Sequence, residues 1–153
     1  MTDFMTKRIT KELAKLETDK IEGIALIDCK NIMVWHVEIK GPPDTPYENG
    51  VFKMLIRFEN SDYPVRPPSV KFITPMYHPN IYRDGKICID ILQQEWSPIQ
   101  TIRTILISIM SLLNDPNPAS PANREAAELY NKNRDEYNNK VREHVIANKD
   151  IKI

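Results

Sequence analysis

The sequence predicts an α+β fold with an N-terminal helix, a four-stranded antiparallel sheet, an irregular segment and three C-terminal helices. This prediction depends on the distribution of proline, on two segments of alternating apolar and polar residues, and on helical apolar spacing near both ends. All 12 prolines lie between Pro42 and Pro121. Because proline removes a backbone donor and disrupts helix interiors, helices form most easily outside this range.

An apolar stripe at spacings of three and four residues predicts the first helix, which should end near Asp19. The stripe consists of Met5, Ile9, Leu13 and Leu16. Four basic residues fall toward the outer side of this helix: Lys7, Arg8, Lys11 and Lys15. Such a face is either solvated or a docking surface.

Four strands are predicted over residues 24–29, 32–39, 51–58 and 69–73. Alternation in the second and third strands places their apolar side chains on one face. These side chains are Met33, Trp35, Val37 and Ile39, then Phe52, Met54, Ile56 and Phe58. Turn residues such as Glu48-Asn49-Gly50 join the strands, so consecutive strands can pair as an antiparallel meander. Helices must then cover one face.

Three helices are predicted after the irregular segment. Residues 102–113 are nearly apolar all round, as a central buried helix requires, and Asn114-Asp115-Pro116 ends them. Ser120-Pro121 is typical of an N-cap followed by proline at the first helical position, which predicts a helix through Tyr130. An apolar spacing marks the last helix at Tyr137, Val141 and Val145.

Composition favours one soluble globular domain over residues 1–153. The chain is 41% hydrophobic and 27% charged, and it is long enough to close a core without disulfides or metal. Lys+Arg and Asp+Glu number 21 each, so no basic excess indicates direct binding of nucleic acid or of a membrane. Without an apolar run of about 18 residues or a secretion signal, an intracellular protein with free thiols is expected.

Residues 74–100 are irregular in structure and contain the residues that could take part in a chemical reaction. A compact domain rarely keeps such a segment without a purpose. Cys88 lies there, after the Asp84-Gly85 turn. It is either a reachable nucleophile or, between two isoleucines, a buried small apolar residue, and residue type does not decide between them. Cys29, on a predicted strand, is expected to be structural.

Several cysteine chemistries can be tested against the sequence. A phosphatase needs an arginine six residues after its cysteine, but Gln94 occupies that position. A peptidase needs a histidine beside the thiol, which His78 could supply only through folding. The 3 His and 2 Cys residues have no metal-ligand spacing, so no metal is expected. Without a phosphate-binding or dinucleotide motif, any energy source must act upstream.

Three motifs occur in order: Tyr77-His78-Pro79-Asn80-Ile81, Gly85-Lys86-Ile87-Cys88-Ile89-Asp90-Ile91-Leu92 and Trp96-Ser97-Pro98. In these motifs, with Cys88 eight residues after Asn80, the chain resembles the ubiquitin-conjugating enzymes. The resemblance runs from Lys7-Arg8-Ile9 to Asp115-Pro116-Asn117-Pro118 and the predicted last helix. It implies an antiparallel four-stranded sheet flanked by four helices, which agrees with the fold class predicted above.

The resemblance implies that Cys88 accepts the C-terminus of ubiquitin as a thioester from an ATP-using activating enzyme and passes it to a substrate lysine. The chain itself then needs no cofactor. Two other functions stay open: conjugation of another ubiquitin-like modifier, and binding of ubiquitin by a non-catalytic scaffold of the same fold. Such scaffolds typically lose the cysteine, so Cys88 together with Asn80 and Asp90 favours an enzyme.

Roles for the residues around the cysteine also follow from the resemblance. Asn80 is expected either to donate a hydrogen bond to the oxyanion or to brace its loop. His78 is expected to be a structural part of its turn rather than a base. Tyr77 and Pro79 are also expected to be structural. Asp90 is expected to orient the lysine ammonium or accept its proton, with a solvated loop carboxylate as the alternative.

Ser120 matches the family's gate position opposite the thiol, where many members carry Asp. Serine lacks the carboxylate's charge, so proton acceptance at this position is in doubt. Phosphorylation of Ser120 would supply the charge. The alternative role, as the N-cap of the helix that Pro121 opens, can coexist with the first.

Two partner surfaces are implied. The residues that match the activating-enzyme positions are Lys7, Arg8 and Lys11. The residues that match the loops contacting RING-type ligases are Val65, Ser97, Pro98 and Ile99. Val65 replaces the Phe of broadly acting members, which should narrow the choice of ligase. Residues 31–35 and 120–123 look most like the DNA-damage-tolerance and histone-ubiquitinating subgroup, and a location in cytoplasm and nucleus is expected. A monomer is the default expectation.

Overall fold

The four strands form one antiparallel meander, as the sequence predicts. In the computed structural model, which describes residues 3–149, the strands lie in the order β1-β2-β3-β4. Their bounds are Ile24–Asp28, Val34–Lys40, Val51–Arg57 and Ser69–Phe72. The register pairs Trp35 with Ile56 and Val37 with Met54, so the buried side chains of neighbouring strands share one face.

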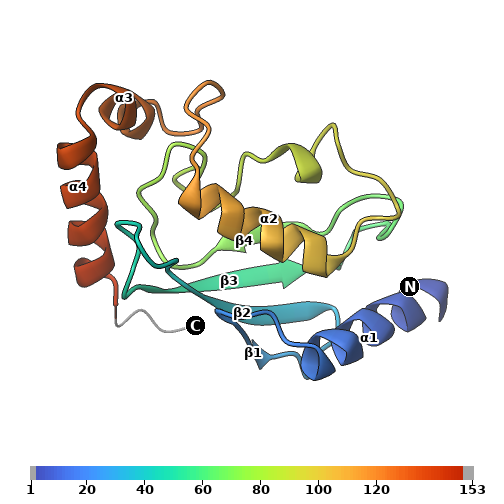
Figure 1. Cartoon of the computed structure of the whole chain (residues 1–153). Helices are drawn as coiled ribbons and strands as arrows, with labels where there is room; N and C mark the ends of the chain where they lie inside the picture. The colour runs from blue at the N-terminus through green and yellow to red at the C-terminus, as the bar shows by residue number, and fades with distance from the viewer. Residues whose placement is uncertain (1–2, 150–153) are drawn as a thin grey trace.

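Helix α2 crosses that face of the sheet, with α1 at one end and α3 and α4 at the other (Figure 1). The helices span Asp3–Thr18 (α1), Ile102–Asn114 (α2), Arg124–Lys132 (α3) and Arg134–Ala147 (α4). A short 3₁₀ helix, η1 (Asp90–Leu92), follows Cys88. Helix α2 begins where Thr101 and Thr104 cap each other's backbone N–H groups, which satisfies donors left free by the first turn.

The core lies between the sheet and α2. Four residues of α2 are fully buried against it: Ile102, Ile105, Leu106 and Ile109. Burying a side chain of this size stabilises the fold by about 1.5–3 kcal/mol. All four residues of the predicted α1 stripe are buried as well. However, α2 is not apolar and buried all round, because Ile107 and Ser111 on its outer side are exposed.

The prediction that Ser120 caps a helix opened by Pro121 is wrong. Helix α3 begins at Arg124, and its N-cap is Asn123, whose side chain accepts from the Ala126 N–H at 3.1 Å. The reason is a contact distant in sequence. The carbonyl oxygen of Pro79 accepts the N–H groups of Ala122 at 2.7 Å and Asn123 at 3.0 Å, which holds residues 120–123 in a loop.

The second strand also starts later than predicted, at Val34 rather than at position 32. The Asn31 side chain accepts from the Met33 N–H at 3.0 Å, and the Asn31 carbonyl oxygen accepts from the Val34 N–H at 3.0 Å. Asparagine therefore closes a turn where the apolar alternation alone favours strand. Within residues 3–149, none of the helices is both long and apolar enough to cross a membrane.

Candidate active site

His78 anchors the irregular segment in the interior. Its side chain is fully buried, its Nε2 donates to the Leu112 carbonyl oxygen at 2.8 Å, and its Nδ1 accepts from the Asn80 N–H at 2.9 Å. Burial lowers the pKa of His78 to about 4. The imidazole is therefore neutral near pH 7 with both nitrogens occupied, which leaves it no free nitrogen to act as a base.

Asn80 connects this segment to the loop before α3. Its side chain is only 1% exposed. The Nδ2 group donates to the carbonyl oxygens of Asn117 at 2.8 Å and Ser120 at 3.2 Å, while Oδ1 accepts from the Asn117 N–H at 2.8 Å. Its own carbonyl oxygen accepts from the Cys88 N–H at 2.8 Å. Asn80 thus holds both the backbone of Cys88 and the loop of residues 117–120 that faces it.

A tight turn positions Cys88. Ile81 and Ile87 pair as an antiparallel bridge, and the Tyr82 N–H donates to the Lys86 carbonyl oxygen at 2.9 Å. Gly85 completes the turn at φ 93°, and a Cβ there would lie 2.0 Å from the Phe72 carbonyl oxygen. Only glycine fits at position 85, because the backbone there has a positive φ and the Phe72 carbonyl leaves no room for a Cβ atom.

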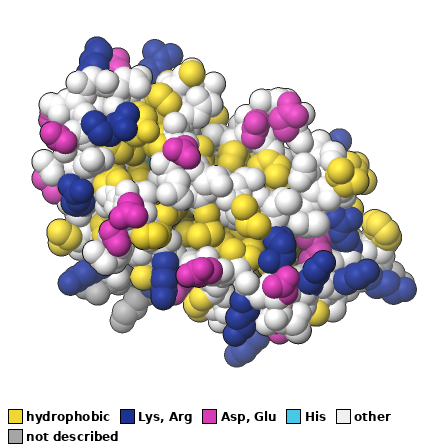
Figure 2. Space-filling model, viewed as in Figure 1, with side chains coloured by type: hydrophobic (Ala, Val, Ile, Leu, Met, Phe, Trp, Pro, Cys, Tyr) yellow, Lys and Arg dark blue, Asp and Glu magenta, His cyan; other side chains and the backbone are white. Residues whose placement is uncertain are grey.

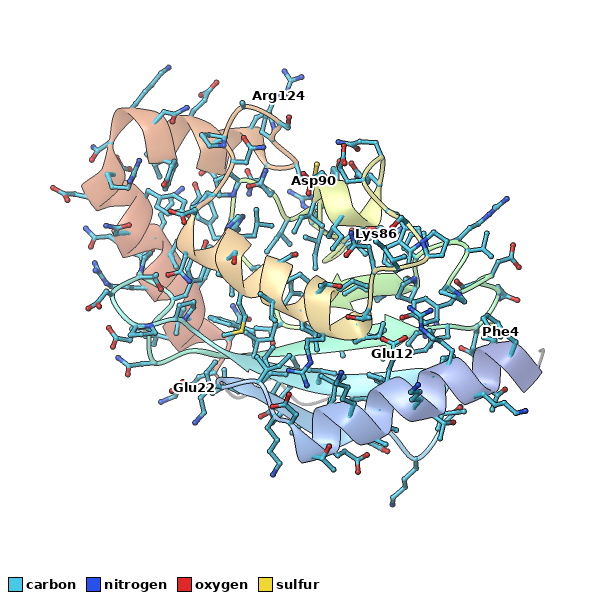
Figure 3. The ribbon with its side chains drawn as sticks, turned by 45° about the vertical axis from the view of Figure 1, so that its right-hand side comes forward. Phe4, Glu12, Glu22, Lys86, Asp90 and Arg124 are labelled. Carbon is cyan, nitrogen blue, oxygen red and sulfur yellow. The ribbon has the colours of Figure 1, made fainter. Side chains whose placement is uncertain are left out.

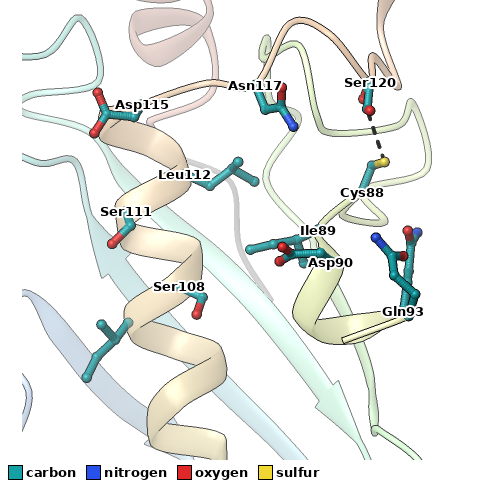
Figure 4. A pocket seen from close by; sticks show the side chains of 12 residues that line it. Cys88, Ile89, Asp90, Gln93, Ser108, Ser111, Leu112, Asp115, Asn117 and Ser120 are labelled. Atoms are coloured by element: carbon teal, nitrogen blue, oxygen red, sulfur yellow. Dashed lines mark hydrogen bonds between the residues drawn. The ribbon is translucent and has the colours of Figure 1, made fainter. Parts of the chain in front are cut away.

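Cys88 is half-buried and lines an open hollow of about 500 Å³. The hollow brings together three of the predicted site residues, Cys88, Asp90 and Ser120, with the outer side of α2. In Figure 4 the Cys88 sulfur points toward Ser120, and Sγ lies 3.7 Å from the Ser120 carbonyl oxygen. The Asp90 carboxylate extends toward α2 in the same view. Two carboxylates line the hollow, Asp90 and Asp115, so it favours cationic groups.

Sequence analysis missed Tyr82 as a neighbour of the cysteine. Interaction with the Cys88 side chain, through hydrogen bonding first and charge second, raises the pKa of the Tyr82 phenol. The side chain is otherwise exposed. The Asp84-Gly85 turn was the available signal, because closing it pairs residues 81–82 with 86–87 and brings Tyr82 to the thiol.

The second thiol is unlike the first. Cys29 lies beyond the end of β1 and packs partly buried against the core. Burial, with added repulsion from Glu17 and Asp28, raises the pKa of Cys29 to about 11. A thiol with so little thiolate at neutral pH is a poor nucleophile. Among residues 3–149, no three His, Cys, Asp or Glu side chains come close enough to hold a metal ion.

The predicted partner residues lie apart from the hollow, around α1. Lys7 and Lys11 are exposed on α1, whose Lys and Arg side chains gather along the lower right edge in Figure 2. Arg8 differs from them. Its Nη2 donates to the carbonyl oxygens of Pro98 at 3.1 Å and Gln100 at 2.8 Å, so it ties α1 to the loop before α2.

The four predicted ligase-contacting residues are not equally accessible. Val65 and Ile99 are 66% and 85% exposed, so both apolar side chains are available to a partner. Pro98 is exposed and Ser97 is partly buried. The two loops are joined by the Trp96 indole N–H, which donates to the Pro64 carbonyl oxygen at 3.1 Å. The exposed side chains of Val65 and Ile99 therefore lie on two loops that a hydrogen bond joins.

Comparison with known proteins agrees with this arrangement. A family model described as ubiquitin-conjugating enzyme matches residues 8–145. The chain is 49% identical over 142 residues to ubiquitin-conjugating enzyme E2 2 of Mycosarcoma maydis, covering 92% of this chain and 76% of that protein. It is 50% identical over 142 residues to ubiquitin-conjugating enzyme E2 3 of Arabidopsis thaliana, covering 92% and 94%. The chain belongs to the ubiquitin-conjugating enzyme family and is a ubiquitin-conjugating enzyme.

Proposed function

We propose that Cys88 is the residue that carries ubiquitin, received as a thioester from an activating enzyme. The contrast between the two cysteines is the main support. Cys88 lines an open hollow beside Asp90 and Ser120, whereas Cys29 packs against the core and has a raised pKa. A carrier sulfur has to be reached both by the donor thioester and by the acceptor lysine.

The chemistry consists of two acyl transfers. In the first, the Cys88 thiolate attacks the thioester carbonyl carbon, a new C–S bond forms, and the cysteine of the activating enzyme leaves as its thiolate. In the second, a substrate lysine amine attacks the same carbon, an amide forms and the Cys88 sulfur leaves. Ordinary lysine, with a pKa near 10.4, is neutral only about once in 2,500 at pH 7. Removing the ammonium proton and aiming the amine is therefore the main catalytic task.

Asp90 is proposed to orient the incoming ammonium or to accept its proton. Its carboxylate lines the hollow together with that of Asp115, which supports this role. Tyr82 is proposed to border the path of the lysine, because its exposed side chain interacts with Cys88, which raises the pKa of the phenol. Bulk around an amine lowers its pKa by removing water, which raises the neutral fraction.

Asn80 is proposed to act chiefly as a brace of the loop. Both hydrogens of its amide are donated to carbonyl oxygens, so a bond to the oxyanion would require the longer one, at 3.2 Å to Ser120, to be given up. Ser120 is proposed to border the entrance for the lysine, where phosphorylation would add negative charge.

The partner surfaces are proposed on the same basis. Lys7 and Lys11 are exposed cations suited to an acidic surface of the activating enzyme, and the bound Arg8 would act there by positioning the loop. Val65 and Ile99 are exposed apolar side chains suited to a RING-type ligase, with Ser97 and Pro98 beside them. A role in DNA-damage tolerance, in cytoplasm and nucleus, is proposed from the resemblance of residues 31–35 and 120–123 to that subgroup. A monomer is proposed as the default state.

A gel assay tests the role of Cys88. The protein is mixed with activating enzyme, ATP and ubiquitin, and the products are separated with and without reducing agent. We expect a thiol-sensitive product heavier by one ubiquitin, formed by wild type and Cys29→Ala and absent in Cys88→Ala. Cys88→Ser should give an oxyester that resists the reducing agent. A thiol-sensitive product in Cys88→Ala would overturn the proposal.

A further inference from the structure

A second hollow, of about 540 Å³, lies on another side of the active-site segment. It is built from residues 75–83, from residues 122–125 where α3 begins, and from Lys140 and His144 of α4, and no residue of α2 lines it. Its ionisable lining residues are Arg83, Arg124, Lys140, His144, Tyr77 and Glu125. The first hollow has two carboxylates and no lysine or arginine, so the two hollows have opposite charge.

We call this second hollow the basic groove. Its positive charge is not neutralised by carboxylates of the protein itself. Glu125, its one carboxylate, is paired with Lys140, whose Nζ lies 2.6 Å from Oε1. This pairing lowers the pKa of the Glu125 carboxyl, so it stays ionised and bound to Lys140. Within the part of the chain that the structure describes, Arg83 and Arg124 make no ion pair and no side-chain hydrogen bond. Two guanidinium groups, each with several donors, are therefore left for an external anion.

Two of the segments that line the basic groove also lie next to Cys88. Arg83 lies two residues after Ile81, whose bridge partner Ile87 directly precedes Cys88, and Ala122 lies two residues after Ser120, whose carbonyl oxygen contacts the Cys88 sulfur. The Pro79 carbonyl oxygen, which accepts from Ala122 at 2.7 Å, joins the two walls. Figure 3 shows Arg124 and Asp90 on the same upper edge of the molecule.

An acceptor protein has to bring one lysine to Cys88, and the residues beside that lysine must cross this edge. We propose that the basic groove binds acidic residues flanking the acceptor lysine, so that the enzyme prefers lysines within Asp- and Glu-rich segments. This inference rests on the proposed role of Cys88. The carboxylates of the first hollow suit the lysine ammonium, and the arginines of the basic groove suit the acidic residues next to it.

Single-turnover discharge of the ubiquitin thioester tests the proposal. The acceptors are three peptides of equal length with one central lysine, flanked on both sides by Glu, Gln or Lys. Each peptide rate is divided by the rate with free lysine measured for the same enzyme. We expect the Glu-flanked peptide to react about fivefold faster than the Gln-flanked one, the effect of two exposed ion pairs.

The variant Arg83→Glu/Arg124→Glu should lose this preference and favour the Lys-flanked peptide. Arg142→Glu is the matched control, because Arg142 lies on α4 but borders a different hollow. Equal rates with Glu- and Gln-flanked peptides would overturn the proposal, as would a preference that survives in the double variant. Failure of the role of Cys88 would look different, because no thioester would then form and no peptide rate could be measured.

Discussion

The side chain of Asn80 holds Asn117 at both ends of its peptide backbone. Oδ1 accepts the Asn117 N–H and Nδ2 donates to the Asn117 carbonyl oxygen, each at 2.8 Å. The pair joins two segments far apart in sequence at the point where Cys88 and Ser120 face each other. The active-site loop is therefore held by a buried amide rather than by regular secondary structure.

Replacing Asn80 with Ala should destabilise the fold as well as slow the chemistry. The change removes the three part-buried hydrogen bonds of the Asn80 side chain to Asn117 and Ser120, and the loss of each costs about 0.5–1.5 kcal/mol. We expect the free energy of unfolding, measured by urea titration, to fall by at least the cost of one of these hydrogen bonds. The control is Asn131→Ala, since Asn131 is exposed. Slower discharge in Asn80→Ala with unchanged stability would instead favour the oxyanion role.

His78 should remain neutral well below pH 6. Its folded pKa of about 4 lies below the value near 6.5 of an unfolded histidine, so the unfolded chain binds more protons between these values. Stability contributed by His78 is thus present above about pH 6.5 and is lost as the pH falls toward 4, by roughly 3 kcal/mol in total.

Nuclear magnetic resonance checks this expectation. The His78 ring signal should stay unchanged from pH 8 to about pH 5, while a short histidine peptide titrates in the usual range. Urea titrations at several pH values should show the accompanying loss of stability on acidification. A His78 signal that titrates near pH 6.5 would contradict the buried, neutral state.

Local patterns in the sequence were sufficient to predict the elements and the core. The alternation of Trp35, Val37 and Ile39 corresponds to their buried face on β2, and the stripe from Met5 to Leu16 is the buried side of α1. Periodicity reports which side of an element is apolar, and burial of that side is the largest stabilising effect. The α+β order of helix, sheet and three helices is confirmed.

The site was harder to predict because its contacts are long-range. Ser120-Pro121 has the local pattern of a helix start, but the Pro79 carbonyl oxygen holds the following N–H groups and moves the start to Arg124. Similarly, the partners of Asn80 lie 37 and 40 residues away, so its residue type alone allowed two roles. A sequence motif does not contain the distances that decide between them.

Glu12 should be important for stability, although sequence analysis gave it no role. One oxygen accepts from the Arg8 Nε at 2.8 Å and from the Tyr63 hydroxyl at 2.5 Å, and the other accepts from the Ile102 N–H at 2.8 Å. Burial raises the pKa of Tyr63, which keeps its hydroxyl a donor. Figure 3 shows Glu12 between α1 and the start of α2.

Glu12→Ala should therefore lower the free energy of unfolding by about 1.5–3 kcal/mol or more, the range for one hydrogen bond to a charged group. Glu17→Ala is the matched control, because Glu17 lies on the same helix and is exposed. Thermal or urea unfolding monitored by circular dichroism measures both. Equal stability of the two variants would show that the Glu12 contacts contribute nothing net.

Cys29 should react slowly with iodoacetamide. Burial raises the pKa of the Cys29 thiol to about 11, which reduces the thiolate fraction about 100-fold below that of an ordinary thiol. Mass spectrometry of tryptic peptides after timed alkylation at pH 7.5 gives the rate, with a free cysteine peptide as reference. In urea, Cys29 should react as fast as the reference. Equal rates in the folded protein would contradict its packed environment.

Ser120→Asp should accelerate transfer to free lysine several-fold. Ser120 is exposed at the hollow and its carbonyl oxygen contacts the Cys88 sulfur, so a carboxylate there would meet the incoming ammonium. Discharge rates are normalised to the amount of thioester loaded. Ser120→Asn has the shape of Asp without the charge and should react like the wild type. If Asp and Asn give equal rates, negative charge at this position is not what promotes transfer, and phosphorylation of Ser120 would not activate the enzyme by this route.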